Sequence, residues 1–445
     1  KGIFGFSLGD GISIDQNPTN DPRFHARFTG TKYQEAKWIS GLSNSPVRTK
    51  CEDGRVSPMT DHPVIIATGE KVQQDVDFTD HSLTRLSQTR TYRSFASSRP
   101  SRVFGARWHS SFDFPRLEKS AETIYDIRFP SQGNQPYFIT ASFSDGLTYQ
   151  YHYRGYPNYY PKDRANGGGS TAGYLNMDSS GFIAIVIGQR TYYYNKTTLN
   201  ISSIHENGNP VYNFEYLGDI LQSVSGRAGK KIKFEYTNSL ATRVIAPDGN
   251  IWEYNYDFNT RNLISVKPPT SLGLLTYHYE DLNDPKLLTG VSVDGVREST
   301  VSYYPDKKVQ QSGTANGDEF ESFVYSNSPA ITSVSDERGQ ATHYNFLVRG
   351  DYRLLTSVSR DASASCIATA AEQEYDTFGN IIKSIDFNGN VTLSAYEESG
   401  LLSTETTAAG TAAEQKIVNT WQGLFLQSTT KYDAANHPYY KVEYQ

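Results

Sequence analysis

Apolar and polar side chains alternate in short stretches along most of this chain. One stretch carries Ile232, Phe234 and Tyr236 on one face and Lys231, Lys233 and Glu235 on the other. The next carries Trp252, Tyr254 and Tyr256 opposite Glu253 and Asn255. Because successive side chains of a β-strand point to opposite faces, this alternation predicts strands with one apolar and one polar face.

Tyrosines recur at nearly constant intervals through the second half of the chain. Mostly 19 to 24 residues apart, they are Tyr194, Tyr216, Tyr236, Tyr256, Tyr279, Tyr303, Tyr325, Tyr344, Tyr375 and Tyr396. A repeated spacing of this length is typical of a repeat architecture. Each period has room for two short strands and a turn.

Glycines accompany the tyrosines at an offset of 13 or 14 residues. They are Gly229, Gly249, Gly317, Gly339 and Gly389, several of them in Asp/Asn-Gly sequences such as Pro247-Asp248-Gly249-Asn250. Glycine supplies the positive φ that tight turns between strands require. A lone hairpin is marginal in water, so we expect successive hairpins to pair edge to edge. The sequence predicts an all-β chain of repetitive antiparallel hairpins forming one long sheet with aromatic ladders.

The first part of the chain lacks this regularity. Residues 1–59 hold turn-prone clusters such as Asp15-Gln16-Asn17-Pro18, which predict an irregular N-terminal leader. From residue 60 a second unit begins, and the alternation over Val72–Phe78 predicts a strand there. The glycine-rich stretch within residues 155–173 predicts a solvated loop.

Composition supports a β-rich chain and excludes several classes of protein. The 445 residues include 32 Tyr and 22 Phe but 2 Met, and only 37% are hydrophobic. A net charge of −6 argues against a generally basic nucleic-acid binder. No apolar run approaches the roughly 20 residues of a membrane-spanning helix. The chain begins at Lys1, which suggests a processed or truncated piece. Cys51 and Cys366 form either one bridge or two unrelated thiols.

Two groups of motifs together resemble a known family. The segment Glu374-Tyr375-Asp376-Thr377-Phe378-Gly379-Asn380-Ile381 resembles the YD repeat, and Asp386-Phe387-Asn388-Gly389-Asn390 fits its companion half. Ala67-Thr68-Gly69-Glu70-Lys71, Thr89-Arg90-Thr91-Tyr92 and Phe104-Gly105-Ala106-Arg107-Trp108 resemble the lead-in domain that precedes the repeats in Rhs proteins. The chain thus resembles the Rhs/YD-repeat family of bacterial polymorphic toxins. Its motif residues are Gly69, Tyr92, Gly105, Trp108, Tyr375, Asp376, Gly379 and Gly389.

This resemblance implies an organisation and a function. It implies a leader at 1–59, an Rhs lead-in domain at 60–130, and a YD-repeat sheet at 131–445 that spirals into a shell. It further implies a secreted or cell-surface bacterial protein that encapsulates or presents a C-terminal toxin cargo in interbacterial competition. The implied partners are that cargo, the remainder of the shell, and secretion-apparatus components such as those of type VI secretion. The family's self-cleaving Asp-Pro-x-Gly segment does not occur before Gln445, so self-cleavage is not carried over.

Other functions remain as alternatives. An extracellular adhesion module could bind carbohydrate or protein through the aromatic face that includes Trp252. A weaker alternative is a toxin-bearing enzyme from which the active domain has been removed. No motif favours catalysis, a bound metal or a cofactor, so we expect a protein that is not an enzyme, with unknown ligand-binding residues.

Several residues could carry chemistry, but each has a plainer explanation. His109 beside Trp108 could bind a ligand, yet a structural role is favoured. His62 and His81, with Asp61, Asp75, Asp77 and Asp80, could bind zinc or transfer protons, but a solvated turn is favoured. His205 lacks a second histidine at the spacing of a zinc protease, and Gly226–Lys231 lacks the spacing of a phosphate loop. The Asp-x-x-Gly turns lack the ligand pattern of a calcium loop.

Overall fold

The computed structural model describes part of the chain. The described residues are 13–15, 27–29, 60, 62–80, 86–95, 103–114, the strands between 118 and 187, and 190–444 except 196, 270–272, 329, 350–351, 363–368, 378–379, 398–399 and 423–424. Features predicted at Cys51, Asp61, His81, residues 155–173, Cys366 and Gly379 lie outside them. Within the leader, β1 (Ser13–Asp15) pairs antiparallel with β2 (Arg27–Thr29).

Residues from 60 to 114 form a small unit of their own, here called the inner unit. Its four-stranded antiparallel sheet consists of β3 (Val64–Ile65), β4 (Glu70–Thr79), β5 (Ser87–Arg93) and β6 (Trp108–Ser110). The strand predicted over Val72–Phe78 is confirmed as part of β4.

The rest of the described chain is one long antiparallel sheet, here called the wall, in which each strand pairs with the next along the chain from β7 to β35. Its first strands are β7 (Glu118–Ala121), β8 (Ile124–Phe129), β9 (Tyr137–Phe143), β10 (Thr148–Arg154), β11 (Tyr174–Met177), β12 (Phe182–Ile187), β13 (Arg190–Asn195), β14 (Ile201–Glu206), β15 (Asn209–Leu217), β16 (Ile220–Ser225), β17 (Lys231–Thr237), β18 (Leu240–Ile245), β19 (Ile251–Asp257), β20 (Asn262–Lys267) and β21 (Leu275–His278). The remainder are β22 (Gly290–Val293), β23 (Val296–Tyr303), β24 (Val309–Thr314), β25 (Glu321–Asn327), β26 (Ala330–Ser335), β27 (Ala341–Arg349), β28 (Tyr352–Arg360), β29 (Thr369–Tyr375), β30 (Ile381–Ile385), β31 (Val391–Tyr396), β32 (Leu402–Thr407), β33 (Gln415–Gln422), β34 (Phe425–Tyr432) and β35 (Pro438–Glu443). A 3-10 helix, η2 (Arg227–Gly229), links β16 to β17.

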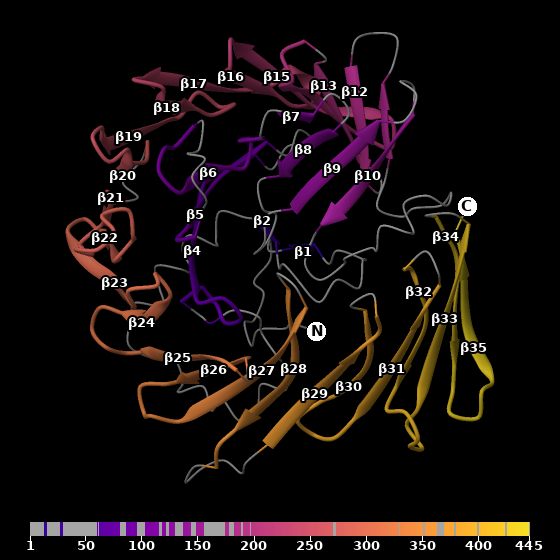
Figure 1. Cartoon of the computed structure of the whole chain (residues 1–445). Helices are drawn as coiled ribbons and strands as arrows, with labels where there is room; N and C mark the ends of the chain where they lie inside the picture. Colours follow the sequence, from indigo (N-terminus) through magenta and orange to yellow (C-terminus); the bar gives the residue numbers. More distant parts are fainter. Residues whose placement is uncertain are drawn as a thin grey trace.

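The wall curves around the inner unit. In Figure 1 the strands pass around a central space, and β4, β5 and β6 lie inside the curve formed by β13 to β26. The strand order of the wall closes, with β35 placed next to β7. The predicted all-β fold of repetitive hairpins in a long sheet is confirmed. The wall begins at β7, within the range predicted for the lead-in domain.

The recurring tyrosines occupy equivalent places in successive hairpins. Those from Tyr194 to Tyr396 lie in alternate strands from β13 to β31, with Tyr279 just after β21. At Tyr216, Tyr236, Tyr256 and Tyr375 the register shifts as at a β-bulge. The predicted repeat therefore corresponds to one strand pair per period.

A hydrogen bond from each of several tyrosines links neighbouring repeats. The hydroxyl of Tyr256 donates to the Ala241 carbonyl at 2.7 Å. Equivalent bonds run from Tyr279 to Leu263, Tyr303 to Leu288, Tyr325 to Val309, Tyr375 to Leu355 and Tyr396 to Ile381. Each bond satisfies a carbonyl in the preceding repeat, so the tyrosine period reflects a repeated contact as well as a repeated strand.

Turn chemistry explains the glycine period. Between β30 and β31, Gly389 has φ of +83°, which few other residues adopt readily. In the same turn, one carboxylate oxygen of Asp386 accepts hydrogen bonds from the backbone amides of Asn388 and Asn390. Such side-chain bonds stabilise tight turns. The predicted Asp/Asn-Gly turn is confirmed at this position.

Removing one tyrosine hydroxyl should weaken the contact between two repeats. We expect Tyr256→Phe to lower the free energy of opening in β18 and β19 by about 1 kcal/mol, because the Ala241 carbonyl loses its donor. Hydrogen exchange of the amides in these strands measures the change. Tyr440→Phe, at an exposed ring, is the matched control. Equal exchange rates in wild type and Tyr256→Phe would contradict a stabilising role for the hydroxyl.

Candidate functional site: the interface between the inner unit and the wall

Aromatic side chains fill the interface between the inner unit and the wall. Phe104, Trp108, Phe112 and Phe114 of the inner unit belong to one buried cluster with wall residues of β13 to β22. Three ring pairs cross the interface: Phe78 with Trp252 at 4.8 Å, Phe104 with Tyr254 at 4.9 Å and Trp108 with Tyr277 at 4.7 Å between centroids. A second cluster joins Val64 and Ile66 to wall residues of β23 to β26. The apolar face of these wall strands is therefore buried by the inner unit.

Backbone hydrogen bonds fix the position of the inner unit on the wall. The amide of Ala106 donates to the Arg261 carbonyl at 2.9 Å, and the amide of Ala241 donates to the Val103 carbonyl at 2.9 Å. The amide of Val309 donates to the Gly69 carbonyl at 2.8 Å. These three are here called the cross-interface amides. Since each depends on the two parts being in contact, their hydrogen exchange reports on docking.

Two of the predicted motif residues are glycines at points of close approach. Gly105 has φ of +86°, and a Cβ atom there would lie 2.5 Å from the carbonyl oxygen of Arg261. Gly69 has φ of +76°, and its Cβ would lie 2.8 Å from Lys308 and from the ring of Tyr325. Both the backbone conformation and the neighbouring wall therefore require glycine.

The other two motif residues of the inner unit bond to the wall through their polar atoms. The Tyr92 hydroxyl donates to the Lys286 carbonyl at 2.9 Å and accepts from the Leu288 amide at 3.0 Å. Burial raises the pKa of Tyr92 to about 12, so the phenol stays neutral. The Trp108 indole Nε1 donates to the Tyr279 hydroxyl at 2.8 Å. All four motif residues of the inner unit thus contact the wall.

The remaining motif residues lie elsewhere. Tyr375 donates to the Leu355 carbonyl, and Asp376 accepts from the amide of Asn380 at 2.9 Å, so both stabilise the wall locally. Gly389 lies in the turn described above. The structure does not bring these residues together with the motif residues of the inner unit.

An ionic cluster inside the interface was missed by the sequence interpretation. Arg90 is fully buried and its Nε donates to both carboxylate oxygens of Asp77, at 2.8 and 3.1 Å. From the wall, the Tyr254 hydroxyl donates to Asp77 at 2.8 Å and the Tyr277 hydroxyl donates to Asp75 at 2.7 Å. The guanidinium also lies over the rings of Trp108, Tyr254 and Tyr277, at 5.3 to 5.8 Å from their centroids. Such a placement stabilises a desolvated cation.

The interpretation of Asp75 and Asp77 as part of a solvated turn is wrong. Their side chains are among the most buried polar groups, at 6% and 4% exposure. In β4 the polar positions of the alternating pattern face the interior, whereas Gln74 faces solvent. The signal available in the sequence was two aspartates on one strand face with an arginine on the neighbouring strand. Such charges are seldom buried unless they are paired.

A second ion cluster lies at the rim of the interface. Asp284 of the wall pairs with Arg107 of the inner unit at 2.7 Å and with Lys307 of the wall at 2.8 Å. Burial raises the pKa of the Asp284 carboxyl, but hydrogen bonds from Lys307 and Arg107 outweigh burial and lower the pKa to about 2. In the inner unit itself, Glu70 pairs with Arg93.

Acid should loosen this rim contact. The carboxyl of Asp284 has a lower pKa in the folded protein than the ordinary 3.8, so its stabilising effect is complete above about pH 4 and is lost as the pH falls toward 2. We expect faster exchange of the cross-interface amides below about pH 4, after correction for intrinsic rates. In Asp284→Asn this acid-induced change should be smaller. An identical acid response in the variant would show that another group is responsible.

The histidines considered in the sequence have structural surroundings. His109 lies 3.8 Å from the Asp113 carboxylate, and neighbouring Trp108 is fully buried, in keeping with the favoured structural role. His62 pairs with Glu319 of the wall at 3.5 Å, and His205 bonds to Ser203 at 3.2 Å. Within the described residues, no three His, Cys, Asp or Glu side chains are grouped so that they could hold a metal ion. The described residues also contain no helix long and apolar enough to cross a membrane.

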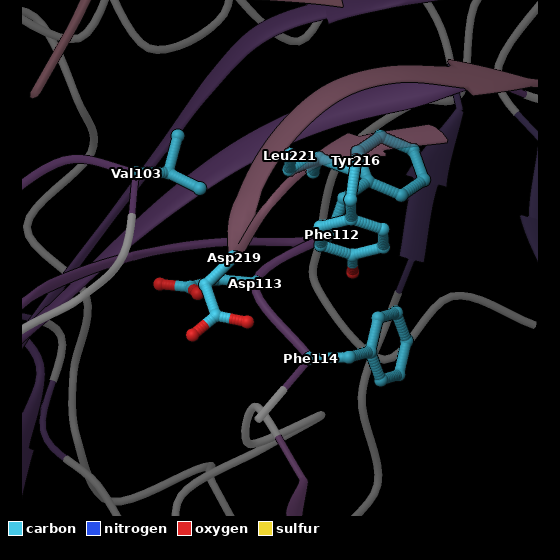
Figure 2. A pocket seen from close by; sticks show the side chains of 7 residues that line it. All are labelled: Val103, Phe112, Asp113, Phe114, Tyr216, Asp219 and Leu221. Carbon is cyan, nitrogen blue, oxygen red and sulfur yellow. The ribbon is translucent and has the colours of Figure 1, made fainter. Parts of the chain in front are cut away.

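One small cavity lies at the edge of the interface. Figure 2 shows the carboxylates of Asp113 and Asp219 beside each other, with Phe112, Phe114 and Tyr216 nearby. The space holds about one water molecule, so it does not suit a cofactor or an organic substrate. The interface therefore acts as a contact between two parts of one chain.

Comparisons with known proteins add a family model and several distant structures. Residues 61–129 match a family described as a domain of unknown function, DUF6531, a range that includes the inner unit and the strands β7 and β8. No curated protein matches the chain.

The chain is similar to two crystal structures of TcdB2-TccC3, both at 8% identity. One match covers 94% of this chain and 24% of the other with a TM-score of 0.35, and the second covers 72% and 19% with a TM-score of 0.33. A Photorhabdus luminescens Tc holotoxin pore with a TccC3 mutation matches at 11% identity, over 84% of this chain and 22% of the other, with a TM-score of 0.31. The chain spans less than a quarter of each of these structures.

Proposed function

We propose that this chain is a non-catalytic segment of a β-shell in a secreted or cell-surface bacterial protein of the Rhs type. In this proposal the wall encloses or presents a toxic cargo for delivery to a competing bacterium, and the cargo, further shell and secretion components are its partners. The motif residues quoted from the sequence support the family. The observation that carries the proposal is a change in the inner face of the wall.

The inner face can be followed from strand to strand by register. Thr332 belongs to it, because its hydroxyl donates to the Ile66 carbonyl of the inner unit at 2.8 Å. Directly opposed residues in neighbouring strands share a face. Thr332 opposes Tyr344, Tyr344 opposes Val358, and Val358 opposes Ala371. The inner face therefore continues into β29.

Beyond Ala371 the inner face becomes polar. Register and the two-residue alternation place on it the half-exposed residues Gln373, Ser384, Thr392, Ser394, Asn419 and Thr429. Under the inner unit, by contrast, the same face is apolar and buried, as at Phe214, Val224, Phe234, Val244 and Phe323. The wall thus changes its inner side chains where the inner unit no longer covers it.

A polar, half-exposed inner face suits a container. Such a face contacts an enclosed chain without forming a permanent core with it, and neighbouring strands satisfy each other's backbone groups. The mechanism is physical: the cargo is kept away from outside partners, and no step of bond chemistry is assigned to the wall.

The aromatic adhesion alternative gains no support. Trp252, the ring suggested as a carbohydrate contact, is 7% exposed and packs against Phe78 of the inner unit. Tyr254 and Tyr277 are buried in the same interface. These rings are occupied in contacts within the chain.

Photocrosslinking from the two faces of one strand tests the proposal. In β31, Ser394 lies on the inner face, while the adjacent Leu393 lies on the outer face and is exposed. A photoreactive residue at position 394 of the natural full-length protein should crosslink to cargo sequence, and the same residue at position 393 should not. Equal crosslinking from both positions, or from 393 alone, would overturn the container proposal.

A further inference from the structure

The interface holds more carboxyl groups than guanidinium groups at one buried point. Arg90 serves two carboxyls, with Asp77 at 2.8 Å and Asp75 at 3.9 Å. All three side chains come from the inner unit, on β4 and β5, and all are buried. The groups that face them from the wall are the phenols Tyr254 on β19 and Tyr277 on β21.

The surroundings of this cluster supply hydrogen bonds rather than further charge. Burial raises the pKa of Tyr254 and of Tyr277 well above the ordinary value, so both phenols stay neutral. Trp108 on β6 contributes its ring, and Gln73 on β4 donates an amide hydrogen to Asp75 at 2.8 Å. Arg90 remains charged, since the attraction of Asp77 outweighs the effect of burial on its pKa.

We propose that Asp75 and Asp77 form a buried proton-binding site, which takes up one proton when the inner unit docks on the wall. The site is independent of the proposed function, because it depends only on the contact between the inner unit and the wall. One guanidinium balances one carboxylate, and the second carboxyl avoids an uncompensated buried charge by holding a proton. The proton belongs to the pair rather than to one residue.

The direction of the pH effect follows from this arrangement. Burial, together with the neighbouring Asp75, raises the pKa of Asp77 above its ordinary value even though Arg90 and Tyr254 lower it. A group with a higher pKa in the docked state stabilises docking below that pKa, and the effect is lost as the pH rises through it. Docking should therefore loosen from weakly acidic to alkaline pH, a range separate from the acid loss at Asp284.

Hydrogen exchange of the full chain tests the proton uptake. Protection of the cross-interface amides is measured between about pH 5 and about pH 8, corrected for intrinsic rates and compared with amides of β31 and β32, far from the inner unit. In wild type, protection should fall with pH, by at most about tenfold per unit for one proton. Asp77→Asn and Asp75→Asn should each flatten this fall. Asp248→Asn, in an exposed turn, is the matched control and should behave as wild type.

Infrared spectroscopy provides a second measurement that needs no variant to fold. With aspartate labelled at its carboxyl carbon, docked wild-type protein at neutral pH should show the carbonyl stretch of a protonated carboxyl. Its absence, or the same pH dependence of exchange in wild type and Asp77→Asn, would overturn the proton-binding site. A band that disappears in a folded Asp75→Asn or Asp77→Asn variant would establish it.

Discussion

Replacing Trp108 by alanine should release the inner unit from the wall more readily than any other single truncation of its core. We expect the free energy of opening at the cross-interface amides to fall by about 3–5 kcal/mol, the range measured when a buried tryptophan becomes alanine. Trp108 is fully buried, packs on Tyr92 and Tyr277, and donates to the Tyr279 hydroxyl. The variant loses ring contacts, a hydrogen bond and filled volume together.

The matched control is the tryptophan of the wall far from the inner unit. Trp421 in β33 is half-buried, and its Nε1 donates to the Leu402 carbonyl at 3.0 Å. Trp421→Ala should raise exchange in β32 to β34 and leave the cross-interface amides unchanged. If Trp108→Ala left the exchange of those amides as in wild type, the indole would not hold the inner unit in place.

The repeat fold was largely predictable because its signals are local. Alternation from Lys231 to Tyr236 depends on residues next to each other, and the burial of Ile232 and Phe234 agrees with it. The spacing from Tyr236 to Tyr256 needs only one neighbouring hairpin. A sheet in which every strand pairs with the next makes such short-range patterns sufficient to predict the architecture.

The interface was not predictable, because its contacts join distant parts of the chain. Arg90 and Tyr277 are 187 residues apart, and Tyr92 and Leu288 are 196 apart. No spacing rule connects such pairs. In β4 the alternation correctly indicated a strand but suggested the wrong buried face, because the pairing of Asp77 with Arg90 reverses the usual preference of apolar residues for the interior.

Motif residues of the inner unit mark this interface even though the sequence interpretation gave them only a general structural role. Gly105 is required where the backbone meets the Arg261 carbonyl, and Tyr92 bonds to the backbone on either side of Leu287. A glycine in a loop and a tyrosine in a strand have many ordinary explanations. Only the position of the wall distinguishes a docking contact from a local turn.

Replacing Arg90 by methionine should have an effect of similar size, with a different dependence on pH. Methionine keeps much of the volume but removes the cation, so Asp75 and Asp77 are left buried beside two neutral phenols. Breaking a buried ion pair by removing one partner costs about 3–5 kcal/mol. We expect this loss in the opening free energy of the cross-interface amides at neutral pH. It should shrink in acid, because protonated carboxyls need no cation.

Two further variants separate charge from packing in that result. Arg243→Met removes an exposed arginine that pairs with Glu235, and should change stability by less than about 1 kcal/mol. Adding Asp77→Asn to Arg90→Met removes one of the two unbalanced carboxyls, so the double variant should dock better than Arg90→Met alone at neutral pH. Contacting residues are expected to show such non-additivity. If the two losses simply added, the contribution of Arg90 would come from packing against Trp108, Tyr254 and Tyr277 rather than from its charge.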